Sequence, residues 1–145
     1  MILAAVFTLA TLPWLTDLIG VADFVWDDNG LVKYNHRLAE PGIVLRAWSQ
    51  TWVAESDMPD TRPRNAGYYR PLSMLSVAAD RWVWGFEARG YRLTSLLLHA
   101  TGATLLFTLL LRLGVSFLVA GVLTLAFAWH PVHGGIMATA TYRTT

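Results

Sequence analysis

The chain has 145 residues, of which 54% are hydrophobic and 14% are charged, and its formal net charge is +1. Soluble domains usually carry about 25% charged residues, so this composition indicates a membrane protein. The small net charge gives no electrostatic basis for binding nucleic acid, and the absence of cysteine excludes disulfides and thiolate metal sites.

The first apolar segment covers residues 1–21. Its first 16 residues carry no charge, although Pro13 and Asp17 interrupt the apolar pattern. A membrane span needs roughly 20 apolar residues, so this one is marginal. The alternative is a signal peptide cleaved near Gly20 and Ala22, but such a signal usually has basic residues before its apolar core, and this segment has none. We therefore expect a retained transmembrane helix.

Residues 22–92 form a long polar and aromatic loop. Within it, Pro41 to Ala54 places Val44, Trp48 and Trp52 on one face at a spacing of four. This pattern predicts a short amphipathic helix lying in the membrane interface. The alternative is a small soluble subdomain that packs its own tryptophans, although about 70 residues bury little core alone.

The same loop predicts a turn-rich connection and a second helix. Residues 56–67 are rich in turn formers and predict a loop. Pro71 to Trp84 predicts a helix, because Pro71 stands in its first turn and Gly85 just past its end.

Residues 93–145 are predicted to form a helical hairpin followed by the start of a second outer loop. Leu93 to Leu111 contains 19 residues without a formal charge, which is about 28 Å of helix. Val115 to Trp129 follows after a connection too short for anything but an antiparallel neighbour. Small residues recur at every fourth position of this second helix and predict close helix packing: Ala120, Thr124 and Ala128.

The predicted fold is therefore an all-α membrane protein. It has about three transmembrane helices, plus one or two amphipathic interfacial helices in a long first loop. Two apolar segments separate Asp27–Asp28 from His130–His133, so both polar groups face the same side of the membrane. Composition leaves open which side this is, because the positive-inside rule applies to short loops and nine of the eleven Lys and Arg residues lie in the long one.

Asp27 and Asp28 are the first candidate catalytic residues. They follow an apolar stretch and precede Asn29–Gly30, a turn dipeptide. Two adjacent carboxylates repel each other, and desolvation can raise the pKa of one of them. Such a group can serve as a general base for a hydroxyl, or hold a divalent cation. The alternative is a helix cap or turn acid.

Four further side chains are candidates for binding. Arg70 stands where the loop turns into a helix and can grip a phosphate, or it can snorkel beside the neighbouring tyrosines. His130 and His133 flank Pro131 at a helix end and can face one ligand, or can serve in capping; two histidines alone are a weak metal signal. His99 lies within an apolar helix, where packing or a hydrogen bond to a neighbouring helix is the simplest role.

Four stretches together resemble one family in order and spacing: FVWDDNGLVKYN, YYRPLSML, YRLTSLLLHATGATLLF and LAFAWHPVHGG. The family is the polytopic GT-C glycosyltransferases related to the transmembrane-and-TPR O-mannosyltransferases and their bacterial homologues. Its members typically read F-x-x-DD after the first helix, YRPL, H-x-x-N-x-x-LH entering the second helix, and HPVHTE after the third.

The resemblance implies an integral enzyme of the bacterial inner membrane or the endoplasmic reticulum membrane. Such an enzyme takes a sugar from a polyprenyl- or dolichyl-phosphate carrier in the lipid and passes it to a hydroxyl of a protein or glycan. One of Asp27 and Asp28, with a preference for Asp27, matches the family's first-loop acid. Arg70, His130 and His133 match motif positions that we assign to the carrier phosphate. No metal site or certain cofactor is implied.

The chain departs from the family pattern in two places. Gly134–Gly135 replaces the usual Thr-Glu, and the stretch from Tyr91 to Ser95 lacks the motif's His and Asn. The family also has many more helices, so the chain is expected to be the N-terminal part of such an enzyme, incomplete by itself. The alternative is a small non-catalytic membrane scaffold or subunit that retains the motifs as structural remnants.

Overall fold

The computed structural model describes residues 1–20, 23–25, 28–49, 69–134 and 139. Within these ranges every regular element is helical and there is no strand, as the sequence predicts. The elements, in chain order, are α1 (Ile2–Thr11), η1 (Leu12–Trp14), α2 (Leu15–Gly20), η2 (Asn29–Lys33), η3 (His36–Ala39), α3 (Ile43–Ser49), α4 (Pro71–Trp84), α5 (Ala88–Arg112), α6 (Phe117–Ala128) and η4 (Pro131–His133).

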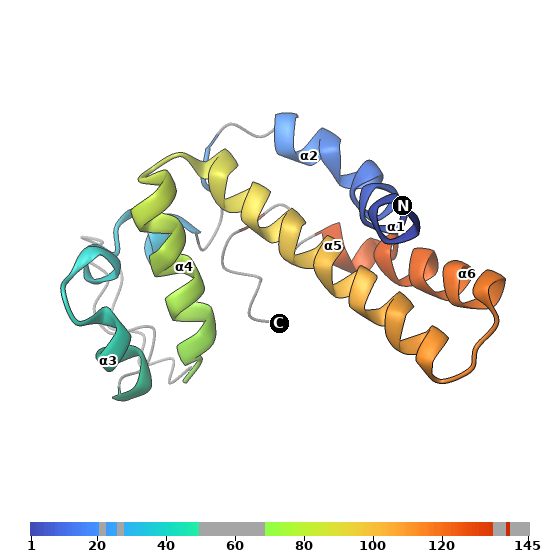
Figure 1. Ribbon diagram of the computed structural model, residues 1–145. Coiled ribbons are helices and arrows are strands. Elements are labelled where there is room, and N and C mark those ends of the chain that lie inside the picture. Colours follow the sequence, from blue (N-terminus) through green and yellow to red (C-terminus); the bar gives the residue numbers. More distant parts are fainter. Residues whose placement is uncertain (21–22, 26–27, 50–68, 135–138, 140–145) are drawn as a thin grey trace.

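The helices gather around α5. Figure 1 shows α1 and α6 lying along the C-terminal half of α5, and α3 and α4 grouped at its N-terminal end. α5 packs against both α1 and α6, while α3 packs against α4. The molecule therefore has an apolar three-helix part and a smaller, mixed part, joined by the α4–α5 corner.

Pro13 divides the first apolar segment, which the sequence predicts as one helix over residues 1–21. Because Pro13 has no N–H, the carbonyl of Leu9 loses its α-helical donor. That carbonyl instead accepts from the Leu12 N–H and from the indole N–H of Trp129, at 3.0 Å for the indole. The segment is thus a broken helix whose exposed carbonyl is satisfied from α6.

The α5–α6 hairpin forms as predicted, with shifted ends. α5 begins at Ala88 rather than Leu93, because the Glu87 side chain accepts from the Arg89 N–H and caps the first turn. The connection covers residues 113–116 and includes Gly114, whose φ of +82° is a conformation that favours glycine.

Small residues bring α6 close to α5, which confirms the predicted stripe. Ala120, Thr124 and Ala128 are all buried. Short side chains let helix backbones approach closely and gain packing contacts where lipid gives no hydrophobic driving force. The same interface includes α1, and its buried residues are Ala10, Ala100, Ala103 and Ala128, with Phe7 packed against them.

The amphipathic helix predicted over residues 41–54 is represented by α3. Val44 and Trp48 are exposed on one face while Ala47 is buried on another, as the spacing predicts. Trp52, the third residue of the predicted face, lies outside the described residues. The exposed apolar face is therefore present over the part of this helix that the structure describes.

α4 has the predicted limits, from Pro71 to Trp84, with Gly85 directly after it at a φ of +60°. The loop predicted over residues 56–67 lies outside the described residues. α4 covers a second core that joins the start of the chain's polar region to the start of α5. Its buried members are Phe24, Val32, Leu38, Ile43, Ala47, Met74, Val77, Ala78, Ala88 and Tyr91.

Polar contacts fix the corner between α4 and α5. The hydroxyl of Tyr91 donates to the Gly85 carbonyl at 2.9 Å. Thr94 donates to the Asp80 carboxylate at 2.7 Å and receives the indole N–H of Trp84 at 3.1 Å. The corner is thus held by side chains from both helices.

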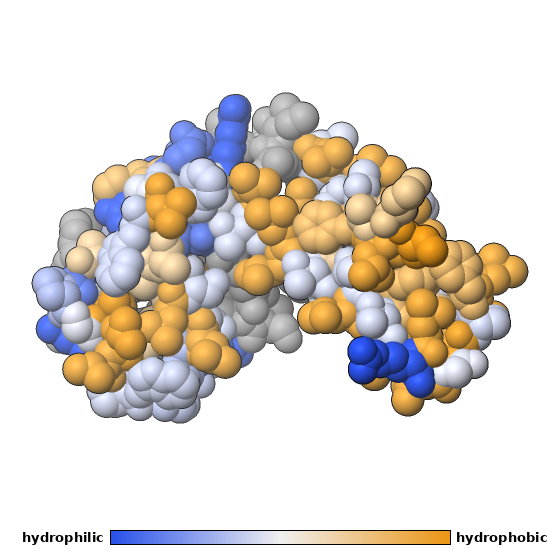
Figure 2. Space-filling model, viewed as in Figure 1, coloured by the Kyte–Doolittle hydropathy of each residue, from blue (hydrophilic) through white to orange (hydrophobic). Residues whose placement is uncertain are grey.

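One described helix, α5, is long and apolar enough to cross a membrane by length and composition. Of its apolar window, 28% is buried inside the structure. Figure 2 shows mainly apolar surface over the α1, α5 and α6 part, interrupted by a few weakly polar residues and one strongly hydrophilic patch. The three transmembrane helices predicted from sequence are therefore not all confirmed: residues 2–14 and α6 are apolar but shorter, and roughly 20 residues are needed.

Candidate functional site

The acidic pair is described at one of its two positions. Asp27, the preferred candidate base, lies outside the described residues. Asp28 is 2% exposed and directly precedes η2, with its N–H donating to the Val25 carbonyl at 3.1 Å. It occupies the N-cap position of η2, where its side chain makes no capping hydrogen bond. Its burial is compatible with a functional carboxylate.

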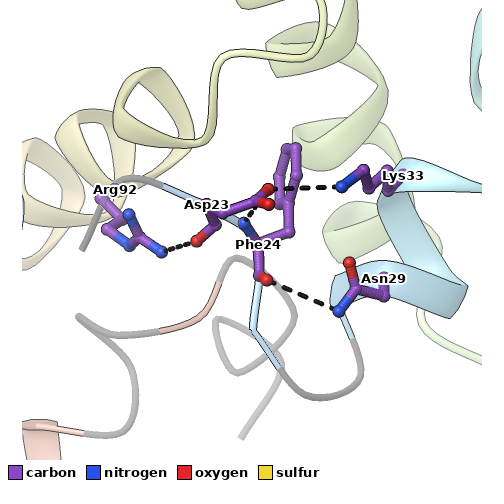
Figure 3. Close-up of polar contacts among 5 residues, drawn as sticks. All are labelled: Asp23, Phe24, Asn29, Lys33 and Arg92. Carbon is purple, nitrogen blue, oxygen red and sulfur yellow. Dashed lines mark hydrogen bonds and ion pairs between the residues drawn. The ribbon is translucent and has the colours of Figure 1, made fainter.

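Hydrogen bonds hold the backbone on both sides of this pair (Figure 3). Asp23 accepts from the Phe24 N–H at 2.7 Å and from Lys33 Nζ at 3.4 Å. These two partners, the backbone N–H first, lower the pKa of the Asp23 carboxyl below its ordinary value. Asn29 donates to the Phe24 carbonyl at 3.5 Å, and Arg92 donates to the Asp23 carbonyl. The acidic segment is therefore fixed before and after the pair.

Arg92 anchors this segment to α5, a role the sequence did not predict. Its side chain is only 3% exposed. Counting back from Leu98–His99, the family's His and Asn positions fall on Arg92 and Ser95, and both are buried. The sequence signal that could have identified this role is the arginine at the position where the family usually has histidine, since a guanidinium is seldom buried without partners.

The structure brings His130 and His133 together, as predicted, and adds His99. The ring centroids of His99 and His133 are 4.7 Å apart, and those of His130 and His133 are 6.4 Å apart. Phe127 stacks on His99 at 5.8 Å, and Trp14 meets His99 edge-on at 6.5 Å. Three imidazoles from α5 and the end of α6 thus form one cluster beside aromatic rings, which we call the histidine cluster.

The carbonyl of Ala128 explains how the histidine cluster is assembled. It accepts from the Trp14 indole N–H and from His99 Nε2, both at 3.0 Å. This carbonyl is among the last of α6, where helical donors run out. The hydrogen bond from His99 to a neighbouring helix confirms the role expected for it from sequence.

Burial lowers the pKa of His133 below its ordinary value, and the neighbouring His99 and His130 add to the effect. Among the described residues, no group of three or more His, Asp or Glu has the geometry to hold a metal ion. A divalent cation between Asp27 and Asp28 stays a prediction, because Asp27 is outside the described ranges.

α5 aligns the acidic segment with the histidine cluster. Arg92 and His99 are seven residues apart, so they lie on the same helix face about 10 Å apart along the axis. Arg92 holds Asp23, and His99 holds the end of α6. Two of the motif regions singled out from the sequence thus converge on one face of one helix.

Arg70 occupies a different position. It directly precedes α4 and its side chain is half-buried. The helix between Arg70 and the α4–α5 corner is about 20 Å long. A shared phosphate between Arg70 and the histidine cluster stays a prediction.

Two curated proteins are similar to this chain: protein O-mannosyl-transferase TMTC2 from Homo sapiens and from Mus musculus. Each is 34% identical over 119 residues, which cover 77% of this chain and 13% of the relative. The chain therefore spans only 13% of the length of the curated relatives it matches. No family model matches the chain, and no solved structure matches it. The identity supports a relation between this chain and the protein O-mannosyl-transferase TMTC2.

Proposed function

We propose that the chain is the part of an integral membrane glycosyltransferase of the GT-C class that carries the catalytic aspartates. The proposed enzyme moves a sugar from a polyprenyl- or dolichyl-phosphate carrier to a hydroxyl of a protein or glycan, and mannose is the sugar to be tested first. The observation that carries the proposal is the alignment, on one face of α5, of the anchor of the acidic segment and the histidine cluster. The similarity to an O-mannosyl-transferase supports the choice of reaction.

The proposed chemistry divides between the two groups. A carboxylate of Asp27 or Asp28 accepts the proton of the acceptor hydroxyl, whose oxygen bonds to the anomeric carbon of the sugar. The bond from that carbon to the carrier phosphate breaks, and the phosphate leaves with the electron pair. N–H donors of His130, His133 and Arg70 stabilise its charge, because charge-assisted hydrogen bonds are the strong ones.

The proposed membrane arrangement places the broken helix α1–α2, α5 and α6 across the bilayer. It puts the region from α3 to the α4–α5 corner on the periplasmic or lumenal surface. Exposed aromatic residues at the end of α4 support this, since tryptophan rings favour the membrane–water interface. The exposed large residues there are Trp82, Val83, Trp84 and Phe86.

A chimaera tests the proposal. This chain would replace the matched 119-residue segment of human TMTC2, and mannosyl transfer would be measured for the parent chimaera and for Asp27→Asn and Asp28→Asn. Loss of a positioned base lowers the rate about 10²–10⁴-fold, roughly 3–5 kcal/mol of barrier. A turn acid instead changes stability by about 1 kcal/mol or less. Full transfer by the double variant Asp27→Asn, Asp28→Asn would refute the assignment.

A non-catalytic membrane scaffold is the second candidate. Gly134–Gly135 stands where the family usually has Thr-Glu, so an acid common in the family is missing. A scaffold predicts that the chimaera assembles normally but transfers no sugar even with both aspartates intact. Restoring the pair by Gly134→Thr, Gly135→Glu should then recover transfer if the missing acid is the cause.

A further inference from the structure

The backbone fixes the tautomers of two histidines in the cluster. A carbonyl oxygen only accepts, so His99 Nε2 carries the hydrogen in its bond to Ala128. His130 Nδ1 accepts from the Val132 N–H at 3.2 Å, so in the neutral ring its hydrogen is on Nε2. The side chain of His130 is exposed, and it therefore offers a ring N–H donor to the surroundings without first taking up a proton.

His133 completes the cluster as the ring between the other two. Its Nδ1 is buried and makes no hydrogen bond to any of the described residues. The titratable groups facing it are His99 from α5 and His130 from its own turn. α6 contributes Phe127, whose uncharged ring meets His133 and whose backbone acts to raise the pKa of His133 against the larger lowering effects. A buried nitrogen of this kind is costly unless a ligand or a proton uses it.

Positive charge on His133 is disfavoured both by burial and by repulsion from the two neighbouring rings when they are charged. An anion removes both obstacles, since it accepts hydrogen bonds from neutral N–H groups and neutralises an imidazolium. The end of α6 also favours a cation over a neutral ring, and its Ala128 carbonyl is already covered by Trp14 and His99. These contacts favour an anion that brings a proton with it.

We propose that His99, His130 and His133 form a proton-linked phosphate site, in which phosphate binding and proton uptake by His133 occur together. Trp14 meets His99 edge-on and the exposed Trp129 directly precedes His130. Tryptophan is typical of headgroup depth, so the phosphate of a lipid is within reach. The inference rests on the proposed function only for the source of the phosphate. Proton linkage itself follows from the three rings.

The experiment uses the 145-residue chain with ¹⁵N-labelled histidine in lipid bicelles. Two-bond ¹H–¹⁵N spectra report the tautomer and protonation of each ring across pH. Three arms are compared at equal ionic strength: chloride alone, inorganic phosphate, and bicelles doped with polyprenyl phosphate. In chloride, His99 and His130 should show hydrogen on Nε2, and His133 should titrate below the ordinary midpoint of about 6.5.

Phosphate should raise the titration midpoint of His133. A rise of one unit corresponds to about tenfold tighter phosphate binding by the protonated form. A response to both phosphates indicates a site for any phosphate group, and a response to polyprenyl phosphate alone assigns the site to the lipid carrier. An unchanged midpoint in both phosphate arms would overturn the proposal.

The variant that tests the role of His130 is His130→Asn. Asparagine is a favoured helix-capping residue, so it keeps an acceptor for the Val132 N–H while removing the exposed ring donor. It should retain the helical circular dichroism and lose most of the phosphate response. A full response in this variant would remove His130 from the site. Loss of the response without loss of sugar transfer in the chimaera would keep the phosphate site but remove His130 from the carrier-phosphate role in the proposed function. An unchanged His133 midpoint in both phosphate arms, with sugar transfer intact, would overturn this inference while leaving the glycosyltransferase proposal standing.

Discussion

Gly90→Ala should destabilise the α4–α5 corner. A Cβ at Gly90 would lie 2.3 Å from Trp84 Cγ, 2.4 Å from Cδ2 and 2.7 Å from Cβ, far inside van der Waals contact. These atoms belong to the root of the tryptophan side chain, so they cannot move without displacing the ring that donates to Thr94. Overpacking of this kind typically costs 1–3 kcal/mol, here taken as about 2 kcal/mol.

Gly102→Ala on the same helix is the matched control. A Cβ there meets nothing within 4 Å. Both variants gain helix propensity of up to about 1 kcal/mol, so their difference isolates the clash with Trp84. The free energy of unfolding is measured by reversible titration with sodium dodecyl sulfate in micelles, followed by circular dichroism. We expect the free energy of unfolding of Gly102→Ala to exceed that of Gly90→Ala by about 2 kcal/mol. Equal stabilities would refute the packing argument.

Three further outcomes are expected. Trp129→Phe removes the indole donor from the Leu9 carbonyl and should lower stability by about 1 kcal/mol in the same titration. Ala120→Leu should weaken α5–α6 packing by about 1–3 kcal/mol, read from the same midpoint. The pKa of Asp23 is lowered first by its hydrogen bond from the Phe24 N–H and then by Lys33, so these contacts of the carboxylate stabilise the fold above about pH 4 and are lost as pH falls through the folded-state pKa. Asp23→Asn should therefore flatten stability against pH in this acidic range, and an unchanged profile would contradict this argument.

Local signals predicted the elements whose limits depend on local chemistry. Pro71 and Gly85 fixed both ends of α4, because proline suits a first helical turn and glycine ends a helix at positive φ. Spacing by four identified the buried stripe of α6. The placement of His99 against a neighbouring helix also followed from its position within an apolar run.

The contacts that build the site are not local, and the sequence did not predict them. The hydrogen bond from Arg92 to Asp23 spans 69 residues. The indole bonds of Trp14 and Trp129 span 114 and 120 residues. Hydropathy and periodicity describe which face of a helix is apolar, but they do not say which side chain on that face meets a distant carbonyl.

The broken first helix shows the same limit. Pro13 was visible in the sequence as an interruption, yet a hydropathy count treats it as one weak residue within a span. Its structural effect is to release the Leu9 carbonyl, which then accepts from the Leu12 N–H and from the distant Trp129 indole. In an apolar environment an unsatisfied carbonyl is expensive, so the break and its distant partner form one feature.

The function of α5 follows from where its polar residues lie. Its lipid-compatible length makes it a candidate span, but Arg92, Ser95 and His99 recur at spacings of three and four and share one face. That face carries the anchor of the acidic segment at one level and the histidine cluster two turns further on. Because the cluster and the acidic segment are tied to one rigid helix, their separation is set by α5 rather than by the loops that carry them. Substitutions that tilt or shorten this helix should therefore impair both groups together, whereas exchanges between apolar residues on its exposed side, such as Leu105→Ile, should leave both intact.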